Sequence, residues 1–291
     1  MSKFFKALEQ AERERAVRRQ TATSEPANGQ GPAVAEPIAY QAPRVSRGLA
    51  KGVSNGFEEP LVSLLAPTSF EAEQYRVLRH VVETLRKDAN LQVVAVSSPG
   101  VGDGKTTTSI NLAGSLAQAA DARVLLVDLD IRRPAVARQL GLAGSKRSLV
   151  DALLDSSLTL EDVVEHLAQV NLSVVPAGGP ARAPYELLQS PRLDALVDEA
   201  RQRYDYVVLD TPPITPVPDC RLIAKCVDGF LVVVAANRTP RGGLAESLAM
   251  MDPAKVVGLV FNGDTRRRRG YYDVYAGAPE RAGWRRAWRR P

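Results

Sequence analysis

The sequence predicts a three-layer α/β fold, in which a doubly wound, mostly parallel sheet lies between two layers of helices. Short, nearly continuous apolar runs recur from residue 91 onward, as expected for strands buried on both faces. A glycine-rich loop separates the first run from a helical segment. Two later runs end in Asp residues, where open α/β sheets place their ligands.

Composition divides the 291 residues into four parts. Residues 1–19 are predicted to form an amphipathic helix. Residues 20–60 are rich in Pro, Gly and Ala without a period, which indicates a flexible linker. Residues 61–263 hold all the apolar runs and form the predicted domain. Residues 264–291 form a predicted flexible tail with nine arginines against three acidic residues, within a net charge of +5. Such a tail favours an anionic partner or membrane surface, and we expect no nucleic-acid partner.

Within residues 61–263 the predicted elements follow in order. The first is a helix opened by a capping box, in which Thr68 and Glu71 satisfy backbone N–H groups. Strands are predicted at 91–97, 123–128, 172–176, 205–210, 229–235 and 256–261. Helices are predicted near 105–119, 135–140, 148–168, 185–203, 217–226 and 241–251.

Membrane and secretory features are missing from the sequence. No apolar run approaches the ~18 residues of a membrane-spanning helix. The N-terminus lacks the apolar core of a secretory signal. Two cysteines, Cys220 and Cys226, form no disulfide framework and are predicted to be small buried thiols. We therefore expect a cytoplasmic protein.

Residues 97–108, with the sequence SSPGVGDGKTTT, give the strongest chemical signal. The glycines let backbone amides turn toward phosphate oxygens, and the following helix N-terminus adds partial positive charge. Lys105 is expected to reach the β- and γ-phosphates of ATP, and the Thr106 hydroxyl to bind Mg²⁺. Pro99 replaces the first glycine of the strict P-loop pattern. The predicted nucleotide-binding residues are Gly100, Val101, Gly102, Asp103, Gly104, Lys105, Thr106 and Thr107.

Three carboxylates follow predicted strands and are expected beside this loop. Asp210 has the position of the acid that holds Mg²⁺, together with Thr106 and Asp130. Asp128 and Asp130 lie two residues apart, so on an extended strand both side chains would point the same way. One carboxylate can then serve the metal while the other accepts a proton from a protein hydroxyl. Asp128 is our first choice as general base, although the two could exchange roles.

Together these motifs resemble those of the bacterial tyrosine kinases of capsule and exopolysaccharide synthesis. The loop is similar to that family's Walker A, residues 128–132 to its Walker A′ and residues 209–213 to its Walker B, within a resemblance covering residues 66–263. The resemblance implies an ATP- and Mg²⁺-dependent protein-tyrosine kinase that phosphorylates itself. Its implied catalytic residues are Lys105, Asp128, Asp130 and Arg132.

The resemblance also implies a ring-like homo-oligomer. Glu73, Arg76 and Arg79 match the family's E-x-x-R-x-x-R helix, which packs against a neighbouring subunit. The local alternative is an ordinary exposed pair between Glu73 and Arg76, worth about 0.2–0.5 kcal/mol.

The tail contains the implied autophosphorylation sites, Tyr271, Tyr272 and Tyr275. In the family a tyrosine cluster enters the neighbour's active site, and a phosphotyrosine phosphatase is the expected opposing partner. This cluster is sparse and an Arg-rich extension follows it. The alternative is that these rings pack on the protein's own surface or on a partner.

The resemblance further implies a membrane chain-length regulator as a separate activating partner. The protein would then lie at the inner face of the plasma membrane, where its basic tail could add a weak surface contact. One rival function is that of a partition or division-site ATPase, which carries a second lysine where this chain has Gly100. Another is a non-catalytic ATP-dependent scaffold of the export complex.

Overall fold

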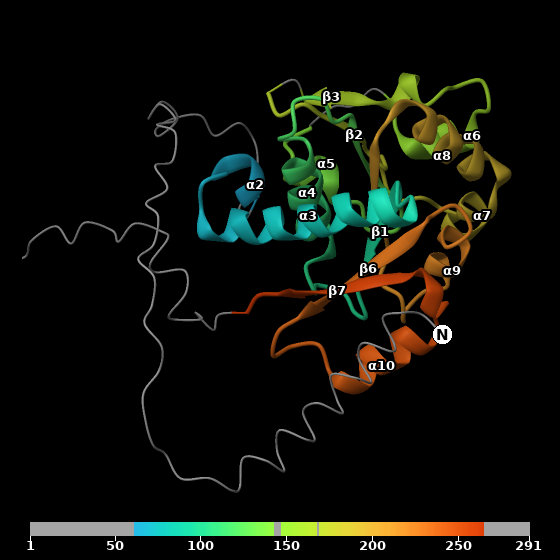
Figure 1. Ribbon diagram of the computed structural model, residues 1–291. Helices are drawn as coiled ribbons and strands as arrows, with labels where there is room; N and C mark the ends of the chain where they lie inside the picture. Colours follow the sequence, from blue (N-terminus) through green and yellow to red (C-terminus); the bar gives the residue numbers. More distant parts are fainter. Residues whose placement is uncertain (1–60, 143–146, 168, 265–291) are drawn as a thin grey trace, which may run out of the picture.

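The computed structural model describes residues 61–142, 147–167 and 169–264 (Figure 1). The predicted N-terminal helix, the linker, and the tail with Tyr271, Tyr272 and Tyr275 lie outside the described residues.

A seven-stranded sheet in the order β3-β4-β2-β5-β1-β6-β7 forms the centre of the domain. Six strands coincide with the predicted apolar runs, which confirms the doubly wound fold. All neighbouring strands are parallel except β3 and β4. The strands are β1 Val93–Ser97, β2 Val124–Asp128, β3 Glu165–Leu167, β4 Leu172–Val175, β5 Tyr206–Asp210, β6 Gly229–Ala235 and β7 Val256–Asn262.

Helices cover both faces of this sheet and enclose two apolar cores (Figure 1). One face packs against α2 to α5, through residues such as Val82, Ile110 and Val136. The other packs against α6 to α10, through residues such as Leu153 and Leu196. The bounds are α2 Val62–Leu65, α3 Phe70–Ala89, α4 Lys105–Leu116, α5 Val136–Gln139, α6 Leu149–Leu154, α7 Pro184–Gln189, α8 Pro191–Arg203, α9 Asp219–Ile223 and α10 Arg241–Ala249, with 3₁₀ turns η1 Glu161–Val163 and η2 Pro253–Lys255.

The helix predicted over 148–168 is wrong for most of its length. Helix α6 ends at Leu154, the next residue is extended, and a 3₁₀ turn and β3 follow. Strand β3 pairs antiparallel with β4 at the sheet edge. Strand β3 is short, and none of its side chains is fully buried. Such a strand needs no apolar run, so its sequence gives no pattern that would predict it.

Two helix boundaries also differ from the prediction. The N-cap of α3 is Ser69, whose hydroxyl accepts from the Ala72 N–H, so the box assigned to Thr68 and Glu71 is wrong. The helix predicted over 185–203 is divided between α7 and α8, because Ser190 is extended and Pro191 starts the second helix.

Parallel pairing brings three strand ends to one edge of the sheet. Val96 of β1 and Asp128 of β2 both lie in register with Asp210 of β5. The phosphate loop and the acidic strand ends therefore meet, as predicted.

The prediction for the two cysteines is confirmed. Cys220 and Cys226 are buried free thiols, and burial raises the pKa of each to about 11. Among the described residues, the helices are all too short or too polar to cross a membrane.

Candidate active site

The loop between β1 and α4 has the backbone that a phosphate cradle requires. Gly102 and Gly104 have φ values of 83° and 97°, a region that residues with a Cβ rarely adopt. A Cβ on Gly104 would lie 1.9 Å from the Asn262 amide nitrogen. Glycine is therefore required here both for conformation and for space.

Residues far away in the chain hold this loop in place. Asp103 accepts from the Gly100 N–H (2.9 Å) and from the Thr239 hydroxyl (3.0 Å). The Asn262 amide donates to the Asp103 carbonyl (3.0 Å), and Arg238 donates to the loop at Gly102. Sequence analysis missed these outer partners. The available signal was that they stand at the ends of β6 and β7, at the same sheet edge as the loop.

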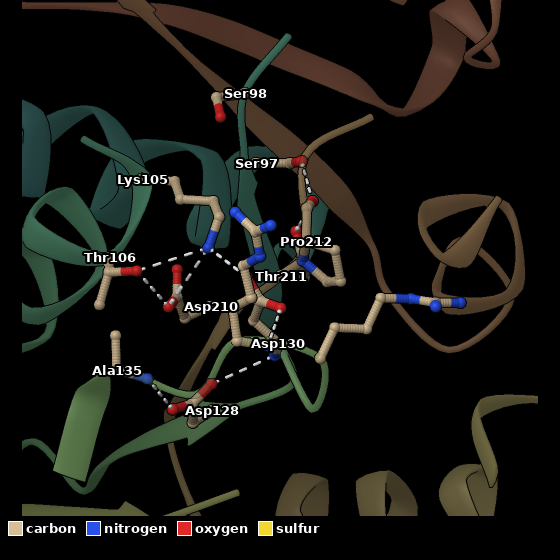
Figure 2. Close-up of polar contacts among 12 residues, drawn as sticks. Ser97, Ser98, Lys105, Thr106, Asp128, Asp130, Ala135, Asp210, Thr211 and Pro212 are labelled. Carbon is tan, nitrogen blue, oxygen red and sulfur yellow. Dashed lines mark hydrogen bonds and ion pairs between the residues drawn. The ribbon is translucent and has the colours of Figure 1, made fainter. Parts of the chain in front are cut away.

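Lys105, Thr106, Asp130 and Asp210 converge at the first turn of α4 (Figure 2). Lys105 Nζ lies 2.6 Å from Asp130 Oδ2 and 3.9 Å from Asp210 Oδ2. The Thr106 hydroxyl donates to Asp210 Oδ2 (2.7 Å), and Ser109 donates to the other oxygen (3.0 Å). The predicted lysine, hydroxyl and two carboxylates thus form one buried network, with Ser109 as an unpredicted member.

Burial and charge oppose each other in this network. Burial alone would lower the pKa of Lys105, but the charges of Asp210 and Asp130 offset it and hold the pKa above its usual value. Burial raises the pKa of Asp210, against the attraction of Lys105. The network holds more carboxylates than cations, so a further cation would stabilise it.

Asp128 makes different contacts from Asp130. Strand β2 ends at Asp128, and Asp130 pairs with Lys105 in the segment that follows. Asp128 Oδ2 accepts from the Ala135 N–H (3.1 Å; Figure 2). It also accepts from the N–H of Val136 (3.1 Å), the first residue of α5. Burial, then the nearby charge of Asp210, raises the pKa of Asp128 to about 7, against those two hydrogen bonds.

Arg132 is held by a carboxylate that sequence analysis did not single out. Its guanidinium donates twice to Asp219, at 2.7 and 2.9 Å, and Asp219 is completely buried at the start of α9. Because two parallel bonds fix the plane of the guanidinium, Asp219 positions Arg132 at the rim of the site.

A cavity of about 570 Å³ opens over this network. That volume lies within the range of small-molecule sites. Asp130 lines the cavity, whereas Asp128 does not. The lining residues that were predicted to bind nucleotide are Val101, Gly102, Gly104, Lys105, Thr106 and Thr107.

The predicted interface residues lie on α3, away from the cavity. Arg76 pairs with Glu73, as the local alternative expected. Arg79 donates to Glu83 (2.6 Å) and to the Ser115 carbonyl at the end of α4 (3.0 Å). The ring interface remains a prediction.

The residues present fit a magnesium ion that arrives with a nucleotide. Thr106, Asp130 and Asp210 offer the hard oxygen atoms that Mg²⁺ prefers. Over the described ranges, no group of three or more His, Cys, Asp or Glu forms a complete protein cage. Mg²⁺ in nucleotide sites takes only one or two carboxylates, with phosphates and water as the other ligands.

The phosphate cradle, the buried lysine and the acidic strand ends on this sheet define a P-loop nucleotide-binding protein. A family described as "AAA domain" matches residues 91–254. Tyrosine-protein kinase YwqD of Bacillus subtilis is 32% identical over 230 residues, which cover 78% of this chain and 95% of that protein. The chain belongs to the bacterial tyrosine kinase family.

Two further similarities bear on this assignment. The kinase domain of Escherichia coli tyrosine kinase ETK superimposes with a TM-score of 0.65 at 26% identity, covering 73% of this chain and 85% of that domain. Succinoglycan biosynthesis transport protein ExoP of Rhizobium meliloti is 32% identical over 220 residues, which cover 73% of this chain but 27% of that longer protein.

Proposed function

We propose that this protein is an ATP-dependent protein-tyrosine autokinase that regulates exopolysaccharide or capsule polymerisation and export. The observation that carries the proposal is the network of Lys105, Thr106, Asp130 and Asp210 under a cavity. The names of YwqD and ExoP support the activity and the pathway class respectively.

In the proposed reaction the tyrosine oxygen bonds to the γ-phosphorus of ATP while the bond to the β-phosphate oxygen breaks, so ADP leaves. Lys105 and the loop amides stabilise charge on the phosphates. Bound Mg²⁺ would neutralise phosphate charge, held through Thr106, Asp130 and Asp210. Arg132, oriented by Asp219, adds positive charge at the rim.

The phenolic proton goes to a carboxylate of the Asp128/Asp130 pair. Asp128 is our first assignment, because a pKa of about 7 suits a general base that works near neutral pH. Asp130 is the alternative, because it lines the cavity. The pH dependence of the rate distinguishes them: its acid limb should disappear in the Asn variant of the residue that acts as base.

The partners follow from the same proposal. The acceptors are Tyr271, Tyr272 and Tyr275 of a neighbouring copy in a ring that uses Glu73, Arg76 and Arg79. A separate membrane chain-length regulator activates the kinase at the cytoplasmic face of the plasma membrane, and a phosphotyrosine phosphatase reverses the modification. The basic tail adds weak contact with that surface.

Incubation of the purified protein with Mg-ATP, followed by phosphotyrosine detection, tests the proposal. Wild type should become labelled, whereas Lys105→Met and a Tyr271→Phe/Tyr272→Phe/Tyr275→Phe variant should not. Phosphate release without phosphotyrosine would instead favour a partition-type ATPase. Nucleotide binding without either product would favour a scaffold.

A further inference from the structure

More cationic than anionic side chains line the cavity. Lys105, Arg132, Arg133 and Arg138 all line it, whereas Asp130 is the one carboxylate among its described lining residues. This excess indicates a ligand with several negative charges.

Lys105 and Arg132 each have a carboxylate partner. Lys105 pairs with Asp130, and Arg132 pairs with the buried Asp219. The side chains of Arg133 and Arg138 are exposed. Across the described parts of the chain, no carboxylate lies within ion-pair distance of the Arg133 guanidinium. Arg133 is therefore available to an incoming anion.

The backbone holds both arginines close to the reacting groups. The Arg133 N–H donates to Asp130 Oδ1 (3.0 Å), which fixes that residue beside the lysine network. Arg138 lies in α5, whose first N–H groups are bound by Asp128. Asp128 and Asp130 thus also help to place the two arginines in the cavity lining.

Another part of the cavity lining is apolar. It consists of prolines and a valine that follow β5, namely Pro212, Pro213, Pro216 and Val217. Apolar surface next to a few charged groups is typical of ligand sites. The apolar part can contact an aromatic ring, and the charged groups then set the orientation of the ligand.

We infer that Arg133 and Arg138 form an anion subsite for the acceptor segment, which selects a tyrosine that has a negatively charged neighbour. This inference rests on the proposed kinase function. In the sequence, Tyr272 stands between Tyr271 and Asp273. The neighbouring anion is therefore either a carboxylate or the phosphate of an adjacent phosphotyrosine, and guanidinium groups bind both bidentately.

The subsite makes phosphorylation of neighbouring tyrosines sequential. A phosphate adds about −1.5 to −2 charges, so the first transfer to Tyr271 strengthens binding of the segment when Tyr272 is the next acceptor. The bonds made and broken in each transfer stay the same. Only the affinity and orientation of the acceptor change.

Peptides of residues 268–277 with Tyr272 as the single acceptor test the subsite. All carry Tyr275→Phe. Position 271 is either Tyr271→Phe or phosphotyrosine, and each form is made with and without Asp273→Asn, which separates the two sources of charge. The enzyme is the full chain with its three tail tyrosines changed to Phe, so that the tail does not compete. The measurements are kcat/KM for each peptide and KM for ATP.

We expect the phosphotyrosine peptide to have a kcat/KM about tenfold above that of its Tyr271→Phe counterpart, and Asp273→Asn to lower it severalfold. An Arg133→Gln/Arg138→Gln enzyme should bring these ratios close to one. Arg147→Gln/Arg203→Gln, which also removes two positive charges but at exposed ion pairs away from the cavity, is the matched control and should keep them.

Three outcomes would overturn the inference. If the enzyme that retains Arg133 and Arg138 phosphorylated all peptides with equal kcat/KM, the subsite would be disproved and the kinase function would stand. A higher KM for ATP with uniform loss on all peptides in the double Gln variant would assign the arginines to the nucleotide. No phosphate transfer to Tyr272 of any peptide, and no phosphotyrosine on the wild-type tail, would reject the proposed function and the inference together.

Discussion

Lys105 Nζ and Asp130 Oδ2 lie 2.6 Å apart, a buried ion pair that joins the first residue of α4 to the segment after β2 (Figure 2). A phosphate that binds at Lys105 must therefore compete with this carboxylate. A metal ion at Asp130 would relieve that competition, because the carboxylate would then have another cation.

Asp130→Asn should separate nucleotide affinity from metal dependence. Removing the charge frees Lys105 for phosphate, so we expect ATP measured in EDTA to bind roughly threefold to tenfold more tightly. Mg²⁺ should then improve affinity less than in the wild type, and phosphotyrosine formation should fall. Calorimetric titrations with and without Mg²⁺ measure both effects, with Asp198→Asn on the surface of α8 as control. If Asp130→Asn lost the same ATP affinity with and without Mg²⁺, Asp130 would not compete with phosphate for Lys105.

Asp128→Asn should change how stability depends on pH. The pKa of Asp128 is raised from 3.8 to about 7, so the folded state keeps a proton that the unfolded chain has lost. Wild-type stability should therefore fall between about pH 4 and pH 7, by up to about 1.4 kcal/mol per pH unit, and level off above. Asp128→Asn has no carboxyl group to titrate at this position, so it should not lose stability in this way. The difference in melting temperature between the variant and the wild type should therefore grow from pH 5 to pH 8. Thermal unfolding in EDTA checks this, and a constant difference across that range would refute it.

The apolar runs predicted six strands because strands buried on both faces need an unbroken apolar sequence. Parallel pairing of those strands then placed Asp128, Asp130 and Asp210 near Lys105. Local patterns failed at β3, which is short and only partly buried. Its strand conformation depends on the edge that β4 offers, and no feature of its own residues shows this.

The supporting residues of the site were not predictable for a different reason. Asp219 binds Arg132 across 87 residues of chain, and Asn262 binds Asp103 across 159 residues. Such pairs depend on how strand ends meet in space, and each partner alone reads as an ordinary polar residue. The sequence motifs of the candidate site are local, whereas the side chains that orient their residues come from distant parts of the chain.

Asp219→Asn should weaken both the domain and the orientation of Arg132. Asp219 is fully buried and Arg132 about one-third exposed, so we expect a loss of about 1–3 kcal/mol in unfolding free energy. Chemical denaturation measures this, together with Arg132→Gln and the double variant. If the double variant lost as much unfolding free energy as the two single variants together, the two residues would not interact. Arg203→Gln, which breaks a more exposed pair with Glu161, should cost less than about 1 kcal/mol.

Gly104→Ala should disrupt the phosphate loop, because Ala is strained at a φ of 97° and its Cβ would collide with the Asn262 amide. Moving that amide breaks its hydrogen bond to the Asp103 carbonyl. We expect a loss of about 1–3 kcal/mol in stability and a large loss of ATP affinity. The matched control is Gly242→Ala in α10, where a Cβ would meet nothing within 4 Å and the helix should gain up to about 1 kcal/mol. Denaturant unfolding and nucleotide titration of both variants check this. If Gly104→Ala kept wild-type stability and ATP affinity, the loop would not need the close approach between Gly104 and the end of β7.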